Sequence, residues 1–87
     1  MYVVDYSITA VRALRKLDNK TAAIIYGWVE KNLMGCENPR VFGKALIGSK
    51  KGYWRYRVGE YRIITDIQDE FVRIEIINVA HRRNVYD

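Results

Sequence analysis

Hydrophobic and polar residues alternate through the second half of the chain, from Trp54 to Val58 and again from Tyr61 onwards. A period of two predicts β-strands with one face buried. Between the two runs, Gly59-Glu60 is a two-residue connection with glycine first, the pattern of a type II′ hairpin turn. The register that follows pairs Val58 with Tyr61, Arg57 with Arg62 and Arg55 with Ile64.

The alternation predicts a meander of three strands, at about residues 53–58, 61–68 and 71–79, with Asp69-Glu70 as the second turn. One face is then almost wholly apolar, and we expect it to pack under helices. That face carries Trp54, Tyr56, Val58, Ile63, Ile67, Val72, Ile74 and Ile76. The opposite face carries Arg55, Arg57, Arg62, Asp66, Arg73, Glu75 and Ile77, with Asp66 opposite Arg73.

The first third of the chain predicts a strand over residues 2–6 and then two helices. Ser7 and Asp18 are good N-caps for them. The first helix repeats apolar residues at Ile8, Val11, Leu14 and Leu17, and the second at Ile24 or Ile25, Trp28, Val29 and Leu33. Gly35 ends the second helix as a left-handed C-cap. A basic loop over residues 41–51 follows, with two glycines and three lysines.

These elements predict an α+β fold of order β-α-α-β-β-β. It is an antiparallel twisted sheet with an N-terminal helical hairpin packed on one face, and the domain spans residues 1–87. A chain of 87 residues has room for little more than one core.

Composition narrows the functional classes. The formal net charge is +5, which favours a polyanionic partner such as nucleic acid over a neutral one. A single cysteine, Cys36, cannot form an internal disulfide, and one cysteine with one histidine cannot build a typical structural zinc site. No apolar run approaches about 18 residues and no signal-peptide pattern opens the chain, so we expect a cytoplasmic protein with no membrane partner.

The polar face of the predicted sheet holds the candidate chemistry. Like charges directly opposite each other destabilise a sheet, so the Arg57/Arg62 pair favours a bound anion on that face. The end of the last strand returns beside Arg62 and brings His81 and Arg82 with it. Guanidinium groups bind phosphate bidentately, and imidazole transfers protons near neutral pH. No carboxylate or histidine cluster indicates a metal, so we expect no cofactor. A solvated sheet face and a surface histidine are the plainer alternatives.

Three motifs then carry a resemblance that covers nearly the whole chain and is most specific from Gly43 onwards. They are Gly43-Lys44-Ala45-Leu46 with Gly48, the run from Trp54 to Arg62 (WRYRVGEYR), and the run from Val79 to Tyr86 (VAHRRNVY). In this order and spacing they resemble the RelE/ParE toxin superfamily, and most of all its RelE branch of type II toxin–antitoxin systems.

The resemblance implies a ribosome-dependent mRNA endonuclease acting in the ribosomal A site. The 2′-hydroxyl would attack the adjacent phosphate and leave a 2′,3′-cyclic phosphate and a 5′-hydroxyl. Arg62 would bind and polarise the scissile phosphate, Arg82 would stabilise the transition state, and Tyr86 would stack on or orient a base. Arg55 stands where RelE toxins carry a basic residue linked to proton transfer. RNA binding is assigned to Lys44, Lys50, Lys51, Arg57 and Arg83.

The identity of the general base stays open. RelE toxins often have lysines on the first hairpin strand, whereas this chain has arginines, whose pKa above 12 makes them poor bases. His81, Tyr53 and an activated water are the candidates.

The resemblance also implies partners and alternatives. The expected partners are a RelB-like antitoxin, the ribosome with its mRNA, and operator DNA through the antitoxin complex alone. The competing functions are a ParE-like toxin that inhibits DNA gyrase, and a non-catalytic module that acts with the antitoxin in autoregulation. Fold analogy alone does not separate these three.

Overall fold

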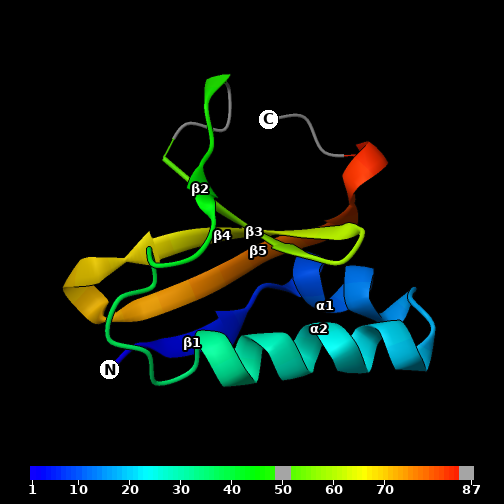
Figure 1. The fold of residues 1–87 in the computed structure, drawn as a ribbon, viewed down its shortest axis with the longest axis horizontal. Helices are drawn as coiled ribbons and strands as arrows, with labels where there is room; N and C mark the ends of the chain where they lie inside the picture. Colours follow the sequence, from blue (N-terminus) through cyan, green and yellow to red (C-terminus); the bar gives the residue numbers. More distant parts are fainter. Residues whose placement is uncertain (49–51, 85–87) are drawn as a thin grey trace.

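The computed structural model describes residues 1–48 and 52–84 as one sheet with two helices on one side (Figure 1). The sheet has five strands in the order β1-β5-β4-β3-β2. The elements are β1 (Val3–Tyr6), α1 (Ile8–Arg15), α2 (Asn19–Asn32), β2 (Lys44–Ala45), β3 (Trp54–Val58), β4 (Tyr61–Gln68), η2 (Asp69–Phe71), β5 (Arg73–His81) and η3 (Arg82–Asn84). The predicted α+β class is confirmed.

Two details of the predicted sheet are wrong. The sheet is mixed, because β1 runs parallel to its neighbour β5, with Val4 beside Ile74. A hairpin forces antiparallel pairing on consecutive strands, but β1 and β5 lie at opposite ends of the chain and no hairpin constrains them. The predicted loop over residues 41–51 also contains a strand, β2, which pairs antiparallel with β3 through Lys44↔Arg55 and Ala45↔Trp54.

Both helices begin at the predicted caps. The Ser7 hydroxyl accepts a hydrogen bond from the N–H of Ala10 at 3.0 Å, and the Asp18 carboxylate accepts one from the N–H of Thr21 at 3.2 Å. Gly35 follows α2 with φ +76°, as a left-handed cap requires.

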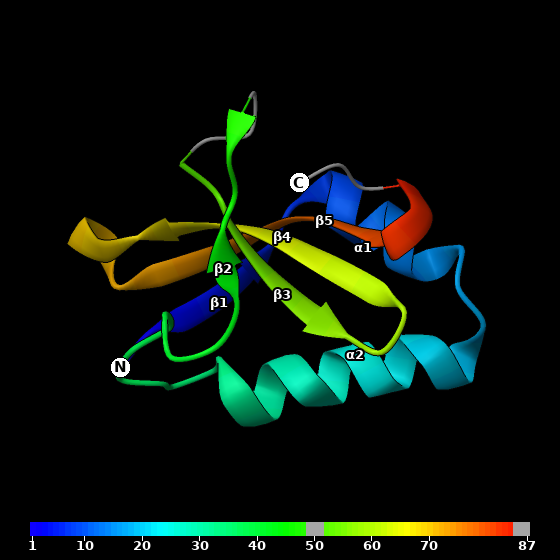
Figure 2. The same cartoon turned by 45° about the horizontal axis from the view of Figure 1, so that its top comes forward.

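The helices cover the apolar face of the sheet, and the view in Figure 2 places α2 beneath the strands. The fully buried core joins Leu14 and Ile25 from the helices to Tyr56, Ile63 and Ile74 from the strands. Of the two alternatives in the second helix, Ile25 is therefore the core residue and Ile24 is exposed. Ile8 begins the apolar repeat of the first helix but is 71% exposed, because it is the first residue of α1, and Ala10 is buried instead.

The β3–β4 hairpin has the predicted register at every pair, including Val58↔Tyr61 and Arg57↔Arg62. Gly59 has φ +59° while Glu60 has no positive φ, which fits a type II′ turn.

The second turn is longer than predicted. It is a 3₁₀ turn followed by Val72 in the left-handed region (φ +50°), so β5 begins at Arg73. Val72 is therefore exposed and not buried. The predicted Asp66–Arg73 pair is wrong too, because Asp66 lies opposite Glu75 and Arg73 lies opposite Gln68.

A β-bulge interrupts the β4–β5 ladder. Ile64 pairs with Asn78 and Thr65 pairs with Ile76, so Ile77 is an extra residue on β5. Side chains alternate between faces, and one extra residue reverses the alternation beyond it. Val79 consequently lies in the core, although it follows Arg73 and Glu75 at odd-numbered positions.

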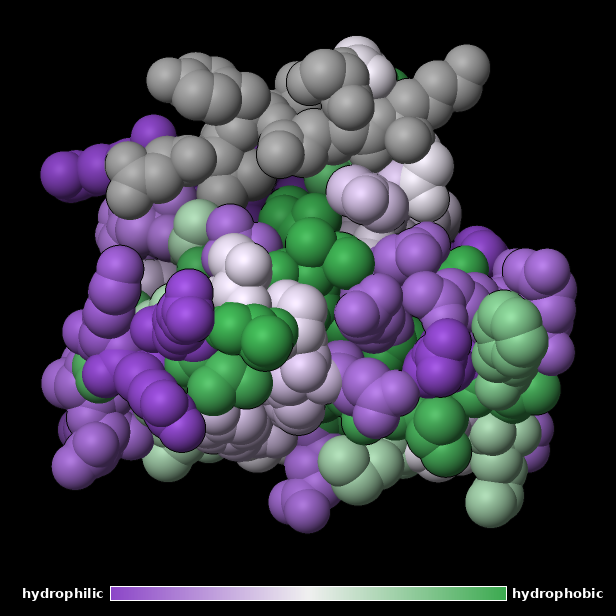
Figure 3. Space-filling model, turned by 180° about the vertical axis from the view of Figure 1, so that it is seen from behind, coloured by the Kyte–Doolittle hydropathy of each residue, from purple (hydrophilic) through white to green (hydrophobic). Residues whose placement is uncertain are grey.

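The outer surface mixes hydrophobic and hydrophilic side chains (Figure 3). In Figure 3 the rear of the molecule shows small groups of hydrophobic residues among hydrophilic ones. No helix in the described part of the chain is both long and apolar enough to span a membrane.

Candidate functional site

The sheet face away from the helices carries the predicted arginines Arg55, Arg57 and Arg62 and is called the arginine face below. Arg57 lies directly opposite Arg62, and Arg62 lies opposite Ala80 of β5 on its other side. Arg55, one step along the same face, pairs with Lys44 of β2. Arg57 is exposed and Arg62 half-buried, while Arg55 is only 8% exposed. The structure thus brings four predicted site residues from three neighbouring strands onto one face.

The end of β5 returns beside the start of β4, as predicted. His81 pairs with Tyr61, and η3 follows at once with Arg82 and Arg83 exposed. The N–H of Arg82 donates to the carbonyl of Glu60 at 2.8 Å, and its guanidinium lies 3.3 Å from the Glu60 carboxylate. Arg82 is therefore tied to the tip of the β3–β4 hairpin, next to the pair of Arg57 and Arg62. In Figure 1, η3 and the end of β2 both rise from the sheet on the side away from α2.

His81 does not lie on the arginine face. Because of the bulge at Ile77 it shares a face with Tyr61, and the two rings pack edge-on with centroids 5.3 Å apart. Its Nδ1 accepts a hydrogen bond from the N–H of Arg83 at 3.3 Å. Three other predicted site residues, Lys50, Lys51 and Tyr86, lie outside the described residues. Within the described part, no three His, Cys, Asp or Glu side chains come together as a metal site would require.

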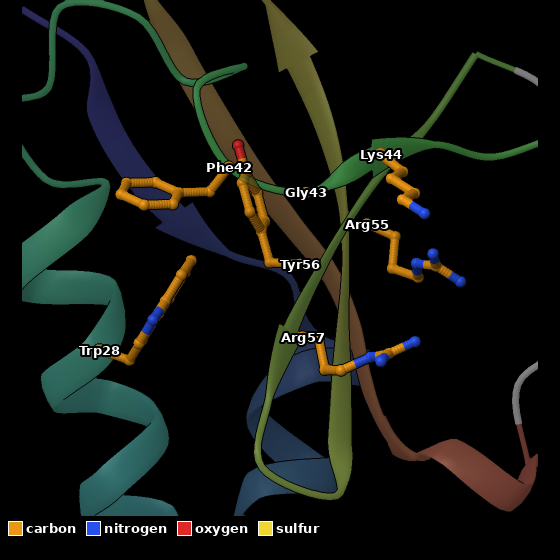
Figure 4. Close-up of a pocket in the computed structure, with 7 residues that line it drawn as sticks. All are labelled: Trp28, Phe42, Gly43, Lys44, Arg55, Tyr56 and Arg57. Atoms are coloured by element: carbon orange, nitrogen blue, oxygen red, sulfur yellow. The ribbon is translucent and has the colours of Figure 1, made fainter.

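A pocket of about 350 Å³ opens at the edge of β3. Figure 4 shows that Trp28, Phe42 and Tyr56 lie on one side of this strand, while the side chains of Lys44, Arg55 and Arg57 point to the other side. Trp28 packs against Tyr56 (centroids 5.4 Å apart) and against Phe42 (6.0 Å). Sequence reasoning took Trp28 as a core residue and assigned nothing to Phe42, since only tertiary packing brings α2 and this loop together.

The loop that lines the pocket is fixed by side chains of β3. The indole N–H of Trp54 donates to the carbonyl of Phe42 at 2.8 Å, and the phenol of Tyr56 donates to the carbonyl of Pro39. Burial raises the pKa of Tyr56 above its ordinary value, so this phenol stays protonated and keeps donating. Gly43 has φ +82° and packs directly on β3.

A second set of contacts anchors the same loop to the β4–β5 turn. Arg40 donates two hydrogen bonds to the carboxylate of Asp69, at 3.1 and 3.0 Å, and the phenol of Tyr2 donates a third at 2.7 Å. The hydrogen bonds from Arg40 and then Tyr2 lower the pKa of the Asp69 carboxyl. The Arg40 guanidinium also lies 5.8 Å from the centre of the Trp54 ring.

Comparison with known proteins places this arrangement in a family. The sequence model of the ParE toxin of type II toxin–antitoxin systems (parDE) matches residues 4–86. The toxin RelE of Mycobacterium tuberculosis is 36% identical over 85 residues, covering 98% of this chain and 86% of that protein. The toxin RelG of the same organism is 32% identical, covering 98% of this chain and 95% of RelG.

Solved structures agree with these sequence matches. A chain of the RelBE2 toxin–antitoxin complex of M. tuberculosis superposes with a TM-score of 0.84 at 31% identity, covering 95% of this chain and 93% of the other. The isolated E. coli RelE toxin superposes with a TM-score of 0.73 at 23% identity, covering 93% and 84%, and shows the shared fold. The chain therefore belongs to the ParE toxin family, within the RelE/ParE superfamily that its motifs indicated, and is a RelE-like toxin of a type II toxin–antitoxin system.

Proposed function

We propose that this toxin is a metal-independent, ribosome-dependent endoribonuclease that cleaves mRNA in the A site and so blocks translation. The observation that carries the proposal is the pair of arginines directly opposite each other, Arg57 and Arg62, on the sheet face away from the helices. Two cations held side by side are unfavourable in the free protein and become favourable once a phosphate lies between them. Arg82 is held next to this pair by the tip of the hairpin.

The proposed reaction uses the RNA's own nucleophile. The 2′-hydroxyl loses its proton to a base and attacks the adjacent phosphorus, while the bond to the 5′-oxygen breaks and that oxygen takes up a proton. The products are a 2′,3′-cyclic phosphate and a 5′-hydroxyl. Arg62 polarises the phosphate and Arg82 stabilises the charge of the transition state, since guanidinium groups are pre-organised cations that do not deprotonate. Tyr86 orients a base by stacking.

The proton-transfer groups are a separate question. Arg55 is buried on the arginine face, and a guanidinium group is poorly suited to transfer protons. His81 is the residue best suited to transfer a proton near pH 7, yet it shares a face with Tyr61. If His81 acts as acid or base, His81→Gln lowers the single-turnover rate and removes one inflection from the pH–rate profile. An unchanged rate and pH profile would assign proton transfer to Tyr53 or to water.

The test of the proposal is cleavage by purified toxin on ribosomes programmed with a defined message, with the new 5′ ends mapped. Arg62→Ala and Arg82→Ala should each lower the single-turnover rate by about 10²–10³, as the loss of one electrostatic donor does. Arg15→Ala, which removes an exposed arginine from α1, is the matched control and should cleave normally. Cleavage of free message by the toxin alone, or equal rates for all three variants, would refute the proposal.

The name of the matched family favours a second candidate, inhibition of DNA gyrase as a ParE-type toxin. A supercoiling assay with purified gyrase separates the two functions, because an mRNA endonuclease leaves supercoiling unchanged. A third candidate, a module that works only in autoregulation, predicts no growth arrest on induction.

The proposed partner in every case is a RelB-like antitoxin. Support comes from the neighbouring structures, which include RelBE complexes from M. tuberculosis and E. coli. The sheet face that carries Arg57 and Arg62 is cationic, and binding of an acidic or amphipathic antitoxin segment would neutralise it when the toxin is inactive. A complex that leaves Arg62 and Arg82 open to solvent would count against this idea. Operator DNA is bound only through that complex.

A further inference from the structure

The pocket at β3 lies where the sheet has an open edge. The ladder of β2 along β3 ends at the pair Lys44↔Arg55, so among the described residues no strand pairs with Tyr56–Val58 on that side. Gly43, the residue just before β2, lines the pocket at this end of the ladder. The volume of about 350 Å³ lies within the range of about 300–1,000 Å³ that small-molecule sites occupy.

The backbone of Arg57 faces this opening. In an antiparallel hairpin closed by a two-residue turn, the flanking pair Val58↔Tyr61 is hydrogen-bonded and the next pair, Arg57↔Arg62, is not. The N–H and C=O of Arg57 therefore point away from β4 and toward the open edge. One donor and one acceptor on the same residue match the edge of a nucleobase, which presents both kinds of group.

The two sides of the pocket are chemically different. Trp28 and Phe42 provide aromatic rings on the helix side, and Phe42 is 46% exposed. The side chains of Arg55 and Arg57 lie on the opposite side of the strand (Figure 4). Single-stranded RNA is commonly recognised by stacking of its bases on aromatic rings and guanidinium planes, with hydrogen bonds to the base edge. All three kinds of group meet at this one edge.

The pocket is also continuous with the arginine face. Arg57 lines the pocket and lies directly opposite Arg62, to which the scissile phosphate is assigned. We propose that the pocket between Phe42 and Arg57 binds the base of one unpaired nucleotide next to the cleaved bond, with that nucleotide's phosphate on Arg57. This inference rests on the proposed endonuclease function and adds a base-binding subsite to it. Base preference at one flanking position of the message follows.

The first experiment measures binding without cleavage. The probe is a fluorescein-labelled RNA hexanucleotide of mixed sequence with 2′-O-methyl groups, which removes the nucleophile and keeps bases and phosphates. Phe42→Ala should raise its Kd by about 5- to 150-fold, the usual effect of losing one base–aromatic stack, and Phe42→Tyr should bind normally. Phe71→Ala is the matched control, because Phe71 is an exposed phenylalanine beside an arginine at the far turn.

The second experiment uses the wild-type toxin and so does not depend on the folding of a variant. Messages with a single abasic nucleotide at each position around the cleavage site are tested on programmed ribosomes. One position should lose about 5- to 150-fold in rate, and the Phe42→Ala variant should show no further loss there, because the same contact is already missing.

The outcomes separate this inference from the proposed function. Normal hexanucleotide binding by Phe42→Ala, or additive losses in the abasic experiment, overturns the base subsite while leaving cleavage intact. Binding that depends on Phe42 in a toxin that cleaves no message supports the subsite and refutes the endonuclease. Displacement of the hexanucleotide by a peptide of alternating Leu and Glu, with equal hexanucleotide binding by Phe42→Ala and wild type, would assign the edge to strand addition by a protein.

Discussion

Gly43→Ala tests how closely the loop of the pocket packs on β3. A Cβ atom built on Gly43 would lie 2.2 Å from the carbonyl oxygen of Arg55, 2.8 Å from the indole nitrogen of Trp54 and 3.0 Å from the ring of Tyr56. The first of these is a backbone atom of a paired strand, so no rotation of a side chain relieves the overlap. The chain must instead move β2 away from β3.

The free-energy cost of Gly43→Ala has two parts. A side chain in the left-handed region costs about 1–2 kcal/mol. Moving β2 also breaks the hydrogen bond from Trp54 to Phe42 and the one from the N–H of Leu46 to Tyr53, at about 0.5–1.5 kcal/mol each. The free energy of unfolding should therefore fall by about 2–5 kcal/mol.

The matched control is Gly35→Ala. Gly35 has nearly the same φ, +76° against +82°, but a Cβ there meets no atom within 4 Å. This variant should lose only the backbone part, about 1–2 kcal/mol. Urea denaturation followed by tryptophan fluorescence gives both values. Equal destabilisation of the two variants would show that the loop does not pack on β3 as described.

Three further predictions concern the core, the hairpin tip and the acid limit of stability. Ile63→Ala should destabilise by about 2–5 kcal/mol in urea denaturation, while Ile24→Ala, at an exposed position, should change little; a loss under about 0.5 kcal/mol for Ile63 would mean the core is misplaced. Glu60→Gln removes the ion pair that holds Arg82 at the hairpin tip and should lower the single-turnover cleavage rate about 1.5- to 5-fold, because exposed ion pairs contribute about 0.2–1 kcal/mol; an unchanged rate would show that this ion pair does not position Arg82. The pKa of Asp69 is lowered in the folded state, so its stabilising contribution is present above the unfolded value of about 3.9 and is lost as pH falls through the folded value. The thermal stability advantage of wild type over Asp69→Asn should therefore shrink in acid, and a constant difference down to pH 2.5 would contradict this reasoning.

The parts of the fold that were predictable depend on short-range rules. Ser7 and Asp18 mark the helix starts because their side chains accept hydrogen bonds from residues three further on. The glycine at 59 and the alternation around it determine the hairpin register, and that register alone brings Arg57 and Arg62 together. These rules need no knowledge of the rest of the molecule.

The parts that were missed depend on contacts between distant segments or on a single irregular residue. Val72 adopts a left-handed conformation that valine rarely takes, and no residue from Asp69 to Phe71 indicates this conformation. The sequence does not indicate the bulge at Ile77 either, because isoleucine suits either face of a strand. The prediction brought His81 beside Arg62 because the end of the last strand returns there, but the His81 side chain shares the other face with Tyr61. The pocket needs Trp28 and Phe42 from separate elements, which no local pattern connects.

The bulge at Ile77 determines on which face of the sheet the last side chains of β5 lie. The Ser7 hydroxyl donates to the carbonyl of Ile77, so the start of α1 holds the irregular residue in place. If the bulge were lost with the length unchanged, Ile77 would lie opposite Ile64, and the side chains of Val79 and His81 would move to the opposite face of the sheet. A substitution elsewhere on β5 changes single contacts, whereas loss of this bulge would change the pairing of the whole end of the strand with β4.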